Sequence, residues 1–271
     1  MVLRLAAENW IAHHLIGIDE VAGLRLIGVS KPVVAMFLVV ALLLLTFLPF
    51  GRRVRRDVAP RGVLVNLLEV ILLFLRDEVT RPILGKEGDK YLPVVWTFFF
   101  FILYCNLLGL IPTPLPVPLV DAHTGTVEWS LLGGVTATGQ FLVTMTLALI
   151  AFVWWHGLGI YEQGLIAYLR HICPGGVPGF LKLPLWAIEF VLHFVKAGAL
   201  MIRLWANMTG GHAVLYAMIG LIFIFGTYWI APVSVAAGVA VFMLEIFVAF
   251  LQAFVFTFLV VVFLGDALHP H

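Results

Sequence analysis

The sequence predicts an all-α polytopic membrane protein with about five membrane helices and an interfacial amphipathic helix. Of its 271 residues, 62% are hydrophobic and only 11% are charged, whereas soluble domains carry roughly 25% charged residues. The mean hydropathy is +1.09. So large an apolar excess cannot be hidden in one water-soluble core, and several apolar runs are long enough to cross a bilayer. The net charge of +1 by itself says nothing about nucleic acid, but the sequence has no basic patch with interleaved aromatics, so we expect no nucleic-acid partner.

The start of the chain predicts an outside N-terminus followed by a first crossing. Residues 1–31 scatter charges among apolar residues and lack a cleavage signal, so we expect an amphipathic segment rather than a signal peptide. Val33–Phe50 has the length of a membrane helix, and Pro32 suits its first turn. The basic cluster Gly51–Arg56 then places this end on the cytoplasmic side, or the matrix side of an organelle.

The next segments alternate in polarity. In Arg61–Gly85 leucines and valines alternate with charged residues, which is typical of an interfacial helix, expected over about residues 61–85. Leu92–Ile111 is a second crossing, and the proline-rich loop to about Ser130 has acidic residues but no Lys or Arg, as expected outside. Gly133–Trp155 returns inward, and we expect both cysteines of the chain to be unpaired.

The last part of the chain is nearly continuous apolar sequence. We expect a strongly tilted helix pair at about 179–264, turning near Gly226 and Pro232, because each helix exceeds the ~20 residues that a perpendicular crossing needs. Residues 32–271 then form a single membrane domain. The sequence has no internal repeat, which gives no support to an inverted-repeat transporter.

Polar residues in these two helices fall into two groups. At about 100° per residue, five of them share one face of the first helix: Glu189, His193, Lys196, Arg203 and Asn207. His212 lies about 140° away, and Glu245 and Gln252 share a face of the second helix, seven residues apart. The expected geometry has this charged stripe facing a partner, and His212 close to Glu245.

Ionisable residues at membrane depth cost roughly 2.5–3.5 kcal/mol each on insertion scales and are candidates for function. Simpler interpretations stay open: Lys196 could reach the interface, Glu189 could lie near a helix end, and Arg203 could pair with Glu189 or Glu245. His212 and Glu245 could be only a buried hydrogen-bonded pair. If functional, arginine supplies a fixed cation, while histidine and glutamate exchange protons.

The segment "RLWANMTGGH" at 203–212, with Glu189 fourteen residues upstream of Arg203, resembles subunit a of the F-type ATP synthase. Glu245 and Gln252, "YCNLLGLIP" at 104–112 and "TATGQFLVTMTLAL" at 136–149 extend the resemblance over most of the chain after residue 90. Two positions depart from the family pattern. Ala197–Gly198 replaces a proline and a small or aromatic residue, and Gln140 stands where many members have asparagine.

The resemblance implies a proton-conducting stator subunit of the membrane sector with two offset half-channels. Arg203 would face the carboxylates of a rotating c-subunit ring as the gate between them. His212 and Glu245 would serve the outer half-channel, with Asn106 and Gln252 lining it; Glu189 would lie near the inner exit, and Asn207 would assist on the ring-facing stripe. In some members the acid and the histidine occupy their two positions in the opposite order.

The resemblance also implies a non-catalytic subunit without cofactor or bound metal. Its partners would be the c-subunit ring, the b subunits of the peripheral stalk, the remainder of the ATP synthase, the lipid bilayer and protons. The expected location is the bacterial plasma membrane, with the N-terminus outside and the C-terminus cytoplasmic; an organelle inner membrane is the alternative. A stand-alone ion channel, a secondary transporter and a purely structural membrane subunit are the rival functions.

Overall fold

The computed structural model describes residues 31–54, 62–110, 116–120, 127–131, 137–171, 179–225 and 229–268. Several sequence predictions concern residues outside these ranges. They are the N-terminal amphipathic segment up to residue 30, the basic residues Arg55, Arg56 and Arg61, most of the outside loop, the break at Pro174–Pro178, the turn residue Gly226, and Cys173. Cys105, which is described, is unpaired and buried, as expected.

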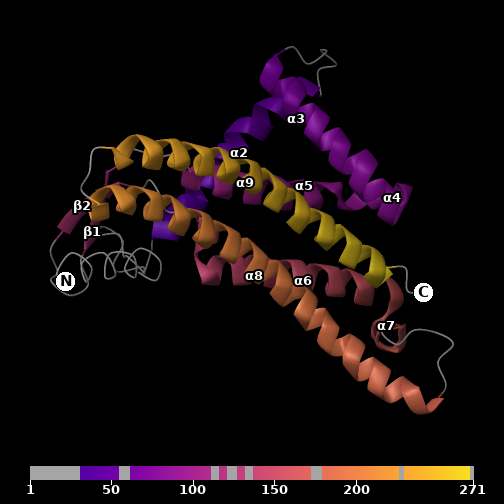
Figure 1. Ribbon diagram of the computed structural model, residues 1–271. Coiled ribbons are helices and arrows are strands. Elements are labelled where there is room, and N and C mark those ends of the chain that lie inside the picture. The colour runs from indigo at the N-terminus through magenta and orange to yellow at the C-terminus, as the bar shows by residue number, and fades with distance from the viewer. Residues whose placement is uncertain are drawn as a thin grey trace. The chain divides into compact units, whose positions relative to one another are not determined.

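Five helices among the described residues are long and apolar enough to cross a membrane. They are α2 (Lys31–Val54), α5 (Leu92–Leu110), α6 (Phe141–Gln163), α8 (Gly179–Phe225) and α9 (Ile230–Leu268) (Figure 1). Their number confirms the predicted helical, polytopic membrane architecture. Pro32, Pro93 and Pro232 lie in first turns, where helices tolerate proline because those N–H groups lack intrahelical partners in any case, whereas Pro49 and Pro184 lie inside α2 and α8.

The segment expected as one helix over about 61–85 has three parts. α3 (Val63–Phe74) continues through a π-helical turn (Leu75–Thr80) into α4 (Arg81–Leu84), and a 3-10 helix (Lys86–Tyr91) follows. The wider turn has a local cause, because the Thr80 hydroxyl donates to the Leu75 carbonyl at 2.9 Å. Gly85, at φ 67°, then ends α4 in a conformation that favours glycine.

Exposed ion pairs join this segment to the residues after it. Asp77 pairs with Arg76 and with Arg81, each at 2.9 Å, and Arg81 also binds Asp89 at 2.7 Å. The neighbouring Arg76 guanidinium, which is hydrogen-bonded to Asp77, holds the pKa of the Asp77 carboxyl below its ordinary value. These charges therefore neutralise one another within the segment.

Two short strands lie where the sequence suggested only a loop. β1 (Pro116–Val120) pairs antiparallel with β2 (Val127–Leu131), with Pro116 opposite Leu131 and Val120 opposite Val127. The sheet has only these two strands, so each strand has one unpaired edge. Prolines are tolerated on such edges because no neighbouring strand needs their missing N–H group.

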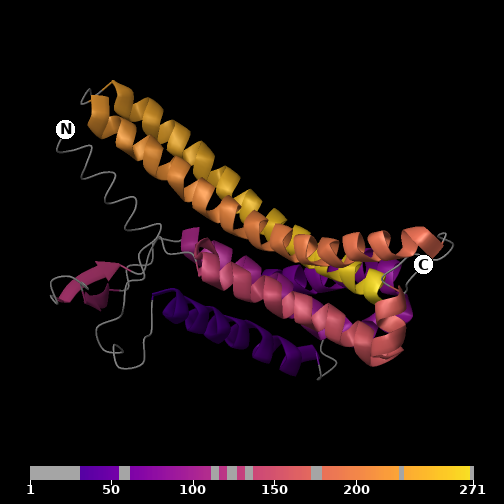
Figure 2. The same ribbon diagram turned by 90° about the horizontal axis from the view of Figure 1, so that it is seen from below.

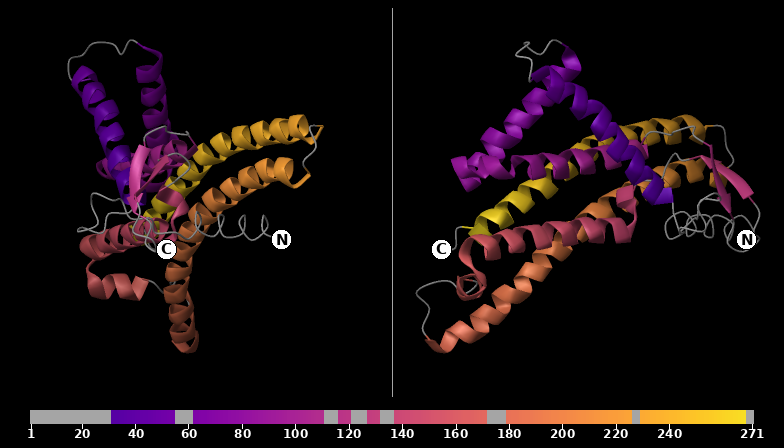
Figure 3. Two further views of the ribbon diagram at one scale, coloured as in Figure 1. Left: turned by 90° about the vertical axis from the view of Figure 1, so that its left-hand side faces the viewer. Right: turned by 180° about the vertical axis from the view of Figure 1, so that it is seen from behind.

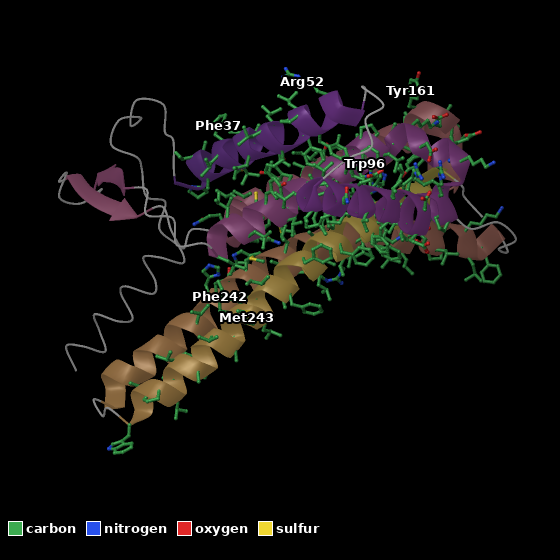
Figure 4. All side chains as sticks on the ribbon, turned by 90° about the horizontal axis from the view of Figure 1, so that it is seen from above. Phe37, Arg52, Trp96, Tyr161, Phe242 and Met243 are labelled. Atoms are coloured by element: carbon green, nitrogen blue, oxygen red, sulfur yellow. The ribbon has the colours of Figure 1, made fainter. Side chains whose placement is uncertain are left out.

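The chain forms two compact units, and five helices contribute residues to both. The first unit comprises residues 1–45, 101–143 and 204–252. The later half of α8 runs beside the early half of α9 in this unit (Figure 2). Leu110, Met208 and Ala249 form a small core between α5, α8 and α9, and Phe242 packs against it (Figure 4).

The second unit comprises residues 46–100, 144–203 and 253–271. Trp155 of α6 is buried there and contacts Phe152 and, on α9, Phe263. Gly164, at φ 82°, makes the turn from α6 into α7 (Leu165–His171), and Figure 3 shows α7 turning back from the end of α6. Tyr161, at that end, is 83% exposed and projects outward (Figure 4).

Gly159 is the point in the second unit where α6 has no room for a side chain. A β-carbon there would lie 2.6 Å from Tyr168 Cε2 and 3.2 Å from the Ala267 carbonyl oxygen. We expect Gly159→Ala to destabilise the protein by about 1–3 kcal/mol, because an aromatic ring and a backbone must move. The check is the thermal denaturation midpoint of the purified protein in detergent.

Gly157→Ala is the matched control, because a β-carbon at Gly157 would meet nothing within 4 Å. On the same helix, this change should leave the midpoint unchanged or raise it slightly, since alanine favours helix over glycine. Equal losses for the two variants would contradict the proposed close packing at Gly159.

Candidate functional site

Glu245 of α9 lies beside His212 of α8 in the first unit, where both border a small cavity. The cavity measures about 10 Å³, roughly the space of one water molecule. Leu110, Met208 and Val248 supply its apolar lining and Asn207 one polar edge. The structure thus brings together the acid and the histidine that the sequence pattern placed on facing helices.

The Glu245 carboxylate is buried, with the residue only 8% exposed. Neither carboxylate oxygen has a hydrogen-bond partner among the described residues. The His212 imidazole borders the same cavity. A buried carboxylate in this position needs either a proton or a polar partner such as water, because an unsatisfied buried charge is costly.

The tautomer of His212 follows from its backbone contact. Its Nδ1 lies 2.9 Å from the Met208 carbonyl oxygen, one turn earlier on α8. A carbonyl can only accept, so Nδ1 carries a hydrogen and Nε2 is the nitrogen that takes up or releases a proton. The residue is therefore held in one orientation while its second nitrogen can exchange protons.

Gly211 allows Glu245 to approach α8 closely. A β-carbon at Gly211 would overlap Glu245 Oε1 and would lie 3.1 Å from its Cδ. The carboxylate thus packs on helix surface that has no side chain. By contrast, a β-carbon on the adjacent Gly210 would meet nothing within 4 Å. The consecutive glycines in "MTGGH" therefore have different roles, which the sequence pattern did not reveal.

Two amide side chains connect this region to neighbouring helices. Asn207 Nδ2 donates to Gln252 Oε1 at 2.7 Å, which ties α8 to α9. Asn106 of α5 is fully buried; it donates to the Ala249 carbonyl at 3.3 Å and accepts from the Thr138 hydroxyl at 2.7 Å. Thr138 lies in the segment "TATGQFLVTMTLAL", but no role was predicted for it from the sequence.

Gln252 keeps one unsatisfied group. The residue is 1% exposed, and its Nε2 has no hydrogen-bond partner among the described residues. Its Oε1 accepts from Asn207, so the amide is oriented while its donor is left for water or for a neighbouring molecule. The polar groups near Glu245 therefore include hydrogen-bonding capacity that the described chain does not fill.

Arg203 is exposed and lies on α8 one turn before Asn207. Within the described part of the chain it makes no ion pair and no side-chain hydrogen bond, so the alternative of an internal salt bridge to Glu189 or Glu245 is not seen. A cation on a helix of this hydropathy needs a counter-charge, which the described residues do not supply.

The rest of the charged stripe turns partly toward the protein's own helices. Lys196 binds Asp266 of α9 at 3.3 Å, and His193 lies against His156 of α6. The Glu189 side chain is half-buried. A helical wheel assigns an angle to each residue but cannot say which neighbour covers that angle, so Asp266 was missed.

No group of three His, Cys, Asp or Glu residues that could hold a metal ion occurs among residues with a described placement. Around Glu245 the described polar side chains are those of His212 and Asn207, with Gln252 bonded to Asn207.

Comparison with known proteins places the chain in one family. The family described as ATP synthase A chain matches residues 33–265. ATP synthase subunit a of Chloroherpeton thalassium is 38% identical over 251 residues, covering 92% of this chain and 68% of that protein. ATP synthase subunit a of Myxococcus xanthus is 40% identical over 240 residues, covering 88% of this chain and 72% of that protein. The chain therefore belongs to the ATP synthase subunit a family.

Proposed function

We propose that this chain is the proton-conducting stator subunit in the membrane sector of an F-type ATP synthase. It is a non-catalytic subunit that carries protons through two offset half-channels. One observation carries the proposal: α8 presents an exposed, unpaired Arg203, and nine residues later it holds a proton-exchanging group against α9. A fixed cation and, on the same helix, one member of a titratable pair suit a gate beside a proton supply.

The outer half-channel runs past Glu245 and His212. The unsatisfied Glu245 oxygens and Gln252 Nε2 support water in this region. Asn106 and Gln252 line the path, and Asn207 holds Gln252 in place. A proton enters on the Glu245 carboxylate or on Nε2 of His212 and leaves toward the partner's carboxylate.

Arg203 acts as the gate. Its guanidinium stays protonated at every relevant pH, so it cannot relay a proton. In a low-dielectric layer it attracts a carboxylate and favours the deprotonated form of that group. Protons must therefore cross on a moving carboxylate rather than pass directly between the half-channels. Glu189 lies on the side of α8 that leads to the inner exit.

The partners follow from this role. The counter-charge for Arg203 comes from the carboxylates of a c-subunit ring, while b subunits and the remainder of the synthase hold the chain in place. The membrane is the bacterial plasma membrane, with the N-terminus outside and the C-terminus in the cytoplasm. Co-purification with a small hairpin subunit and a soluble ATPase supports this assembly; a lone homo-oligomer that conducts ions favours a channel instead.

The first prediction from this proposed function concerns Arg203 as the gate. Arg203→Ala should abolish proton-driven ATP synthesis and raise passive proton leak, because nothing then separates the half-channels. Arg203→Lys keeps a charge but loses the planar fork, so it should restore the barrier only in part. Arg52→Ala, which removes an exposed cation near the end of α2, is the control. Normal ATP synthesis in Arg203→Ala membranes would refute the gate.

The second prediction concerns the titratable pair. His212→Ala and Glu245→Ala should each slow ATP-driven proton pumping, and the double variant should lose little more than the worse single variant. Residues that act in one relay show such non-additivity. The exchanged pair, His212→Glu with Glu245→His, should recover part of the rate. Fully additive losses, with no recovery of the pumping rate in the exchanged variant, would show that the two residues do not act in one relay.

The third prediction concerns the close approach at Gly211. Gly211→Ala should reduce pumping several-fold, because the new methyl group displaces the Glu245 carboxylate. Gly210→Ala, one residue away and facing open space, should keep the rate of the unaltered protein. The measurement is pumping rate at matched levels of assembled complex. Similar rates for both alanine variants would contradict a positioning role for Gly211.

A further inference from the structure

Two histidines and a tyrosine meet in the second unit, away from the Glu245 cavity. His156 comes from α6, Tyr168 from α7 and His193 from α8. The His156 and His193 ring centroids are 5.1 Å apart, with an angle of 44° between the rings, and His156 Nδ1 is hydrogen-bonded to the Tyr168 hydroxyl. The functions proposed above do not use any of these three side chains.

The contacts of these groups assign their hydrogens. His193 Nδ1 lies 2.7 Å from the Glu189 carbonyl oxygen, so it donates, and Nε2 carries the lone pair. Burial raises the pKa of Tyr168 to about 12, so its hydroxyl stays protonated near neutral pH. That hydroxyl donates to Nδ1 of His156, which leaves the ring hydrogen on Nε2.

His156 therefore offers a donor and His193 an acceptor, on rings whose centroids are 5.1 Å apart. His156 Nε2 is buried and has no hydrogen-bond partner among the described residues. Buried ring nitrogens are normally satisfied, and ordered water is the usual partner where the chain provides none. A water between the rings would accept from His156 Nε2 and donate to His193 Nε2.

The surroundings limit this group to one excess proton. Lys196, on the same helix as His193, is held by Asp266 of α9 and lies over the ring of Phe263. Two imidazolium groups beside a lysine would repel one another, so the pair takes up and releases a single proton.

The position of His193 on α8 indicates which side of Arg203 the histidine pair serves. His193 lies ten residues before Arg203 and His212 nine residues after it, which places the two groups about 15 Å and 13 Å from Arg203 along the helix axis. His156 lies in the last turns of α6, before the segment with Arg170 and His171 that the positive-inside rule assigns to the cytoplasm.

We propose that His156 and His193, with Tyr168 as the positioning residue, form a second proton-exchange site, which serves the inner half-channel. The inference rests on the proposed function. In the exchange, the bridging water gives a proton to His193 Nε2, so that an N–H bond forms as an O–H bond breaks. The water then takes a proton from the next water in the path. Release toward the cytoplasm reverses these steps.

The test uses the assembled synthase in vesicles of known orientation. His156→Gln keeps a polar side chain of similar size but cannot titrate. Passive proton flux should fall several-fold, and its dependence on cytoplasmic pH between roughly 5 and 8 should flatten. Its dependence on pH at the opposite face should not change. His193→Gln should have the same effect, and the double variant should be no worse than either.

Tyr168→Phe is the gentler variant, because it keeps the ring and removes only the hydroxyl. It should shift the cytoplasmic pH profile in the same direction, while Tyr161→Phe, at an exposed tyrosine of α6, should not. If a glutamine variant fails to co-purify with the ring, the comparison of Tyr168→Phe with Tyr161→Phe tests the second exchange site instead. An unaltered Tyr168→Phe profile, equal changes at both faces or additive losses would overturn the inference.

Arg203→Ala in the same vesicles distinguishes a failure of the second exchange site from a failure of the proposed function. If Arg203→Ala blocks ATP synthesis while the histidine variants behave like the unaltered protein, the second exchange site is wrong and the gate is retained. If Arg203→Ala still makes ATP at normal rates, the proposed function itself fails.

Discussion

An arginine that makes no ion pair with any described residue, on a helix apolar enough to cross a membrane, is the constraint on which the remaining features depend. A cation in that environment is costly unless another molecule supplies the opposite charge. The neighbouring polar groups are, by contrast, tied within the chain: Asn207 holds Gln252 and Lys196 holds Asp266. α8 is thus anchored to α9 on both sides of Arg203, while Arg203 itself is left for a partner.

The pair of Glu245 and His212 shows how the packing serves the chemistry. A carboxylate is most sensitive to its surroundings when it is dehydrated, and Glu245 is nearly so. Gly211 removes the steric barrier to this burial, and the Met208 carbonyl fixes the histidine tautomer. The cavity beside them has room for about one water, which on the proposed function would bring a proton to the pair without an open aqueous pore.

The sequence predicted the long helices because continuous apolar runs have few alternatives in a membrane. It also placed Glu245 and His212 on the helices that meet. It did not predict the π-helical turn, which depends on one hydroxyl of Thr80, or the β1–β2 hairpin in a proline-rich loop. Nor did it predict the salt bridge to Asp266, since the spacing of residues on one helix carries no information about which charge the next helix brings.

The order of the charged and titratable groups along α8 explains why an arginine lies between two histidines. If protons simply crossed along this helix, a residue that never deprotonates would be the worst choice for its middle. Arg203 instead lies between His193 and His212, two groups that can each hold a proton. On the proposed function, a proton taken up near one leaves the chain, passes Arg203 on a partner's carboxylate and returns near the other. On the proposed function, that forced exit couples proton flow to movement of the partner.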